Sequence, residues 1–160
     1  MTKDELFMKE AVALSATAVE HGNEPFGAVL VKDGEIVYTN ENQIYSLNDP
    51  TFHAEFGLIR RFCAETGITD LREYTLYSSC EPCPMCLSAI IWSNIKKVYY
   101  GNTKEDAADI GFRDEFIYEY LEKISNDKED KKVLKLKELN RDEAIEVFER
   151  YEEDKDKIVY

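Results

Sequence analysis

The sequence predicts an α/β protein in which one sheet lies between layers of helices. Helix-like and strand-like segments alternate along the 160 residues, and no internal repeat or low-complexity linker divides them. The run Ala28–Val31 is apolar throughout, as in a strand that is covered on both faces. A chain of this length makes about one domain. We therefore expect a single three-layer α/β/α domain over residues 1–160.

The first third of the chain predicts a helix and then a hairpin. Thr2 and Glu5 form a capping-box pattern, after which apolar residues recur on one helix face until Gly22. The segment 26–38 contains two strand-like runs separated by Asp33-Gly34, a dipeptide typical of tight hairpin turns. These elements give the first helix and the first two strands of the expected sheet.

The middle of the chain alternates between helix and strand. Thr51 is a suitable N-cap for a helix that Gly67 ends. Residues 74–78 and 97–100 have the composition of short strands. Between them, Pro82 is expected to open an apolar helix that runs through Trp92, because proline is tolerated in a first helical turn.

The last third is more polar. Residues 107–123 have a helical pattern that is interrupted around Gly111, and residues 126–132 form a charged loop. Apolar and lysine residues alternate over 134–137, which predicts a final strand. A last helix is expected to begin near Asn140.

Charge and hydropathy narrow the range of partners. The chain carries 20 Lys and Arg against 33 Asp and Glu, a net charge of −13. Its basic residues do not cluster, and Arg60-Arg61, Lys96-Lys97 and Lys131-Lys132 are isolated pairs. A phosphate backbone is therefore a disfavoured partner. No apolar stretch is long enough to cross a bilayer, and the N-terminus lacks the pattern of a signal peptide. We expect a cytoplasmic protein without a membrane partner.

Two short motifs, His53-Ala54-Glu55 and Pro82-Cys83-Pro84-Met85-Cys86, indicate a catalytic metal. One imidazole and two thiolates are good zinc ligands, and three protein ligands leave the fourth tetrahedral position open for water. The spacing of Cys83 and Cys86 lets both sulfurs face one point near a helix start. Glu55 is then a carboxylate beside the metal, suited to carrying a proton.

The cysteines also allow other interpretations. Cys83 and Cys86 could be a redox dithiol, or Cys80 could complete a closed structural zinc site. The His-x-Glu motif upstream favours the catalytic interpretation. Cys63 and Cys80 are expected to be small buried side chains.

The two motifs together match the His-x-Glu…Pro-Cys-x-x-Cys signature of zinc deaminases. The chain resembles the cytidine/deoxycytidylate deaminase superfamily, and within it the guanine deaminases. Further segments carry this resemblance: 25–29, 48–51, 79–86 and 111–114. The resemblance implies a mixed sheet of about five strands and one zinc ion per subunit, held by His53, Cys83 and Cys86. It also implies that Glu55 is the proton shuttle.

The same resemblance implies roles for further residues. Phe26 would stack on the base, Asn42 would bond its polar edge, and the Ala54 N–H would lie beside it. Asp114 would assist proton transfer or contact the purine. Each has a plainer alternative: Phe26 as core, Asn42 as the end of a strand, and Asp114 as a helix N-cap.

The resemblance further implies a homodimer. The segment of about 140–160 would be exchanged between subunits, and the C-terminal Tyr160 would help to close a site. The sequence departs from the family pattern at Phe52, at Phe56-Gly57 and at Arg113, all near the expected site.

Hydrolysis of guanine to xanthine and ammonia is the leading hypothesis for the activity. Guanosine, cytosine or another small aminated heterocycle are alternative substrates. Adenosine in tRNA is a further alternative, which the charge of the chain disfavours. The alternative of another class is a non-catalytic zinc-binding interaction domain.

Overall fold

The computed structural model describes residues 1–159, and its contacts divide the chain after Tyr118 into two compact units. The first unit contains a mixed sheet with the strand order β2-β1-β3-β4. β1 is antiparallel to both of its neighbours, whereas β3 and β4 are parallel. The strands are β1 (Gly27–Lys32), β2 (Glu35–Glu41), β3 (Thr75–Cys80) and β4 (Lys97–Asn102).

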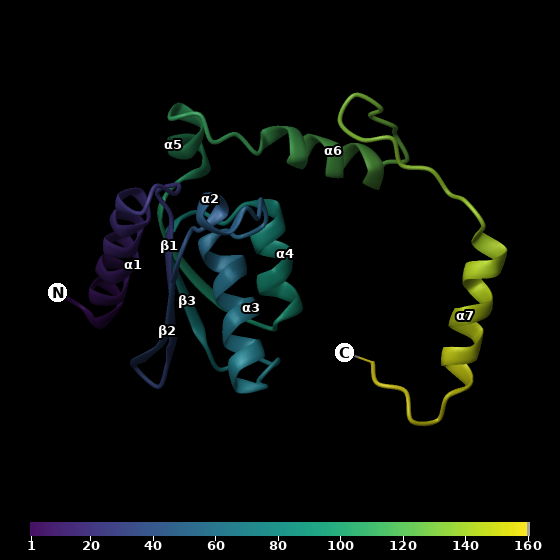
Figure 1. The fold of residues 1–160 in the computed structure, drawn as a ribbon, viewed down its shortest axis with the longest axis horizontal. Helices are drawn as coiled ribbons and strands as arrows, with labels where there is room; N and C mark the ends of the chain where they lie inside the picture. The colour runs from purple at the N-terminus through teal and green to yellow at the C-terminus, as the bar shows by residue number, and fades with distance from the viewer. Residues whose placement is uncertain (160) are drawn as a thin grey trace. The chain divides into compact units, whose positions relative to one another are not determined.

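Helices cover both faces of this sheet, as the α/β/α expectation requires. The helix α1 (Lys3–Glu20) lies on one face, and α3 (Ala54–Thr66) and α4 (Pro84–Trp92) lie on the other (Figure 1). Two short helices, α2 (Ile44–Leu47) and α5 (Lys104–Asp109), follow β2 and β4.

Alternate residues of the central strands pack into two separate apolar cores. Leu30 and Leu76 pack with α3 and α4, whereas Val29 and Tyr77 pack with α1. Because successive side chains of a strand point to opposite faces, β1 is apolar from Ala28 to Val31. This confirms the strand that the run Ala28–Val31 predicts.

Local sequence signals predicted the first helix and the first hairpin correctly. Thr2 and Glu5 form the capping box of α1. The turn between β1 and β2 has positive φ at Asp33 (52°) and Gly34 (75°), the conformation that an Asp-Gly hairpin needs. A side chain at Gly27 would clash with the α1 backbone, since its Cβ would lie 2.3 Å from the Ala11 carbonyl oxygen.

Two predicted helix starts are wrong by two or three residues. The helix expected from Thr51 begins at Ala54, because the Thr51 hydroxyl bonds the Asp49 carboxylate (2.6 Å) and does not cap a helix. The helix expected to open at Pro82 begins at Pro84, with Cys83 as its N-cap. Proline is thus tolerated in the first turn, as expected, but at Pro84.

The sheet has four strands, and the expected fifth strand at residues 134–137 is absent from the described chain. Leu134 and Leu136 are 53% and 69% exposed in an irregular segment. Alternation of apolar and charged residues predicts a strand only where a neighbouring strand supplies hydrogen bonds and a core covers one face. Neither condition is met here.

The second unit, from Glu119 onward, has two helical segments joined by irregular chain. It contains most of α6 (Glu115–Ser125) and all of α7 (Arg141–Glu153). Tyr120 is the one buried residue described in it. Within residues 1–159, no helix is long and apolar enough to cross a membrane. The single-domain boundary 1–160 stays a prediction.

Candidate metal centre and active site

The three expected metal ligands come from the beginnings of two helices. His53 is the N-cap of α3, and Cys83 is the N-cap of α4, with Cys86 one turn into that helix. Both caps have extended backbone and neither side chain makes a capping hydrogen bond. Their side chains are therefore available to turn toward each other, and the positive ends of both helices face the same point.

The donor atoms fit a zinc ion. His53 Nδ1 lies 3.5 Å from Cys83 Sγ and 3.7 Å from Cys86 Sγ, and the three atoms lie within 4.8 Å of one another. Ligand atoms about 2.0–2.3 Å from one tetrahedral ion lie roughly 3.5 Å apart. One imidazole and two sulfurs are also the donor types that zinc prefers. The structure thus brings together the ligands that the motifs predict.

The electrostatics of this group favour the thiolate form of Cys83, which is the form that binds a metal ion. A hydrogen bond from the Cys86 thiol lowers the pKa of Cys83, and the neighbouring His53 lowers it further. The same contact, with burial, raises the pKa of Cys86. The hydrogen bond with Cys83 raises the pKa of His53. Because these three groups bind a metal only when they are deprotonated, a bound ion would displace the protons that they carry.

Glu55 lies in the first turn of α3 and is only 5% exposed. Its Oε1 accepts a hydrogen bond of 2.6 Å from the Ser78 hydroxyl of β3. Burial raises the pKa of Glu55 above its ordinary value, and the negative charge of Cys83 acts in the same direction. A carboxyl group with a raised pKa can hold and release a proton nearer to neutral pH.

The other two cysteines lie outside the metal group. Cys80 Sγ donates to the Thr103 carbonyl oxygen at 3.7 Å, and burial raises the pKa of this thiol to about 11. Burial also raises the pKa of Cys63, which lies half-buried on α3. In the part of the chain that the structure describes, His53, Cys83 and Cys86 form the one such group of ligands. A closed site that includes Cys80 does not agree with this geometry.

A cavity of about 450 Å³ opens beside the metal group, within residues 1–118. Its lining includes His53, Glu55 and Cys83. Phe26 and Phe112 form one side, with ring centroids 5.2 Å apart and planes at 78°. A volume of this size and a partly aromatic lining are typical of small-molecule sites.

Asp114 also lines this cavity. Burial raises the pKa of its carboxyl group, and the negative charge of Cys83 adds to the effect. Its backbone carbonyl accepts from the N–H groups of Ile117 and Tyr118, which places Asp114 at the start of α6. The position at a helix start and the position beside the site are therefore compatible.

Asn42 and Ala54 are buried near the cavity but are not among its lining residues. Asn42 Oδ1 accepts from the Ile44 N–H at 3.1 Å, and its Nδ2 lies 3.4 Å from Glu24 Oε2. Glu24 itself lines the cavity. The roles predicted for Asn42 and Ala54 stay predictions, and Tyr160 lies outside the described residues.

The sequence analysis assigned no role to Glu24, Ser78 or Phe112, which the fold places at or beside the cavity. Phe112 lies within the segment 111–114 that carries the family resemblance, so its position was available as a signal. Ser78 is a polar residue in a strand-like run, and buried polar groups in such runs usually have a specific partner. Nothing in the sequence distinguishes Glu24.

One departure from the family pattern has a packing explanation. The Phe52 ring is 6% exposed and lies under the Arg61 guanidinium, 4.6 Å from its centroid. A Cβ at position 57 would lie 2.6 Å from this ring, so Gly57 is what leaves room for Phe52. Arg113, another departure, is exposed at the cavity.

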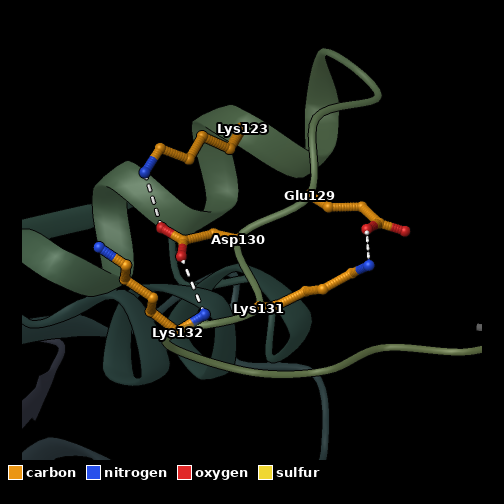
Figure 2. Close-up of a pocket in the computed structure, with 5 residues that line it drawn as sticks. All are labelled: Lys123, Glu129, Asp130, Lys131 and Lys132. Atoms are coloured by element: carbon orange, nitrogen blue, oxygen red, sulfur yellow. Dashed lines mark hydrogen bonds and ion pairs between the residues drawn. The ribbon is translucent and has the colours of Figure 1, made fainter.

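The second unit also has a hollow, in which four of the five lining side chains form ion pairs. Figure 2 shows its five residues, all charged. Lys123 contacts Asp130 at 2.6 Å, and Lys131 contacts Glu129 at 3.0 Å. The Asp130 carboxylate also accepts from the Lys132 backbone N–H at 3.2 Å. Both acidic side chains of this hollow are therefore used in ion pairs.

Comparison with known proteins agrees with the geometry of the first unit. Residues 1–102 match the model of the cytidine and deoxycytidylate deaminase zinc-binding region. The chain is 46% identical over 125 residues to guanine deaminase of Bacillus subtilis, covering 78% of this chain and 80% of that protein. It is 43% identical over 101 residues to the tRNA-specific adenosine deaminase of the same organism, 63% of each chain.

A solved structure is similar over the whole chain. The X-ray structure of guanine deaminase from Bacillus subtilis superimposes with a TM-score of 0.88 at 40% identity, over 98% of both chains. This supports the α/β arrangement and the four-stranded sheet described above.

Proposed function

Because the chain belongs to the cytidine and deoxycytidylate deaminase family, whose members are zinc-dependent hydrolases, we propose that it deaminates guanine to xanthine and ammonia. The observation that carries the proposal is the three-ligand group of His53, Cys83 and Cys86 beside a cavity that also contains the buried Glu55. The similarity to a guanine deaminase supports guanine as the substrate.

His53, Cys83 and Cys86 would hold the zinc ion. When bound, zinc lowers the pKa of a coordinated water molecule toward neutrality. Glu55 accepts one proton of the attacking water on its carboxylate and delivers it to a ring nitrogen. It then takes the remaining proton of the newly added hydroxyl and delivers it to the amine, so that the C–N bond breaks, ammonia leaves and the carbonyl forms. Its burial suits this role, because the raised pKa brings it closer to neutral pH.

The cavity would hold the base between aromatic side chains. Phe26 provides a ring face for stacking, and Phe112 fixes the orientation of Phe26 through their edge-to-face contact. In this proposal Asn42 and the Ala54 N–H bond the polar edge of the base, and Asp114 contacts the ring or assists its protonation. The Asn42 amide would need to exchange its contact with Glu24 for one with the substrate.

The proposal extends to a cytoplasmic homodimer that acts in purine breakdown. Outside the first unit, many large apolar side chains are exposed, among them Leu139, Phe148 and Ile158. A second copy of the chain would cover them if the segment 140–160 is exchanged, as the family resemblance implies. Tyr160 would then reach the site of the partner.

A screen of ammonia release tests the proposed reaction. Guanine, guanosine, cytosine, cytidine and adenine are each incubated with zinc-loaded protein, and binding to tRNA is measured in parallel. We expect release from guanine and no retention of tRNA. Release from another base alone would show that the substrate is wrong. Release from none would favour the interaction domain.

The variant Glu55→Gln tests the proton shuttle. General acid–base groups contribute about 10²- to 10⁴-fold, so kcat should fall by at least about 10² while one zinc per chain is retained. Glu10→Gln, at an exposed position on α1, is the matched control and should leave kcat unchanged. Near-normal ammonia release by Glu55→Gln would contradict the assignment.

A further inference from the structure

Ser78 is a buried hydroxyl that the reaction outlined above does not use. It lies on β3, is 1% exposed, and is not among the residues that line the cavity. Strand alternation places Ser78 with Leu76 on the face covered by α3 and α4, near the end of β3. Substrate therefore does not reach Ser78, so any role in the reaction must act through another residue.

Two short contacts connect this hydroxyl to the site. Ser78 Oγ lies 2.6 Å from Glu55 Oε1 and 2.7 Å from the Cys80 carbonyl oxygen. Both distances lie within the normal range for hydroxyl hydrogen bonds. The carbonyl is fixed by the strand backbone, so the hydroxyl ties the Glu55 carboxyl group to a rigid element of the sheet.

A serine hydroxyl can form a hydrogen bond with Glu55 both when Glu55 is a carboxylate and when it is protonated. A hydroxyl has one hydrogen to donate and lone pairs to accept, whereas a carbonyl can only accept. While Glu55 is a carboxylate, Ser78 donates to it. While Glu55 carries the proton, Glu55 donates to Ser78, and the Ser78 hydrogen turns to the Cys80 carbonyl. The carboxyl group thus keeps its place as the proton comes and goes.

We infer that Ser78 is a positioning residue that holds the Glu55 carboxyl group against the end of β3 through the catalytic cycle. The inference rests on the proposed function, since it concerns the carboxyl group that moves the proton. It stands on the two distances and on burial. An unsupported Glu55 carboxyl group could rotate away from the reacting atoms, and small misplacements of catalytic groups lower rates strongly.

The test compares Ser78→Ala with Ser93→Ala in zinc-loaded protein. Ser93 is also a buried serine that donates to a carbonyl, that of Ile90 at 2.9 Å, but it has no contact with a carboxylate. Loss of a supporting hydrogen bond at a metal site costs about 10- to 100-fold. Ser78→Ala should therefore lose about 10- to 100-fold in kcat at unchanged KM and zinc content. Ser93→Ala should keep its kcat.

Rescue separates positioning from packing. Ser78→Thr retains the hydroxyl and should recover most of the kcat. If the added methyl group prevents folding, Ser78→Cys, a weak donor of similar shape, should give a kcat between those of the wild type and Ser78→Ala. A kcat for Ser78→Ala within twofold of that for Ser93→Ala, or a rise in KM alone, would overturn the inference.

The two proposals fail in different ways. If the wild type releases no ammonia from any base, the proposed function is wrong and the inference falls with it. If the wild type is active on any base and Ser78→Ala remains as active on it, the inference alone is wrong.

Discussion

The cavity has a floor and a wall that are built differently. The floor is the metal group of His53, Cys83 and Cys86 together with Glu55, at the starts of α3 and α4. His53, Glu55 and Cys83 line the cavity, and Glu55 bonds Ser78 of β3. The wall consists of Glu24, Phe26, Phe112 and Asp114, which lie in connecting segments or at their ends. Cys86 and Glu55 of the floor are buried, whereas His53, Cys83 and all four wall residues are partly exposed.

This difference indicates how the chemistry and the choice of substrate are separated. Side chains on regular, packed elements keep their geometry, so the floor can hold the proposed metal ion and proton carrier in fixed places. Loops on a rigid scaffold can change without loss of the fold. We therefore expect substitutions in the floor to abolish the reaction and substitutions in the wall to alter the affinity for the substrate.

The largest expected effect is loss of a floor ligand. Cys83→Ala should lose the bound zinc and reduce ammonia release to background, because two ligands do not hold the ion in a tetrahedral site. Elemental analysis and an ammonia assay measure both. Cys80→Ala and Cys63→Ala are the controls and should retain one zinc per chain. Zinc loss from Cys80→Ala would instead indicate a closed site.

A smaller effect is expected at the wall. Phe112→Ala removes the edge-to-face partner of Phe26, and such pairs contribute about 0.5–1.5 kcal/mol. This corresponds to a rise in KM of about 2- to 12-fold, with kcat and zinc content nearly unchanged. Steady-state kinetics with guanine measures the split. A large fall in kcat would show that the wall takes part in the chemistry.

The smallest expected effect is on the stability of the folded protein, which the burial of Glu55 in the floor lowers. The folded protein raises the pKa of Glu55 above its ordinary value of 4.5, so the unfolded chain releases this proton at lower pH. Stability is therefore lost as the pH rises above 4.5, and the loss levels off above the folded pKa. In metal-free protein, Glu55→Gln should be more stable than the wild type at neutral pH by about 1 kcal/mol.

Thermal unfolding of the metal-free proteins at several pH values checks this sign. The advantage of Glu55→Gln should disappear below pH 4.5, where the wild-type carboxyl group is protonated in both states. Glu10→Gln, an exposed substitution, should show no such pH dependence. An advantage that is constant with pH would mean that the burial of charge is not its cause.

The fold could be predicted where signals are local. The capping box at Thr2, the Asp33-Gly34 turn and the apolar run of β1 each depend on neighbours in sequence, and the structure confirms them. The strand expected at residues 134–137 has the right alternation but no partner strand. Pairing is a long-range property, so alternation alone could not decide it.

For the site, the sequence by itself predicted the three residues that could hold a metal ion and the carboxylate that lines the same cavity. The reason is that His53 and Glu55 lie within one turn of a helix start, as do Cys83 and Cys86, so short spacing fixes each pair. Only the tertiary structure decided which residues contact the site residues. Ser78 bonds Glu55, Phe112 packs against Phe26, and Glu24 lies within 3.4 Å of Asn42. These contacts join residues far apart in the chain, and they arise from the strand order and the loop paths, which no local pattern encodes.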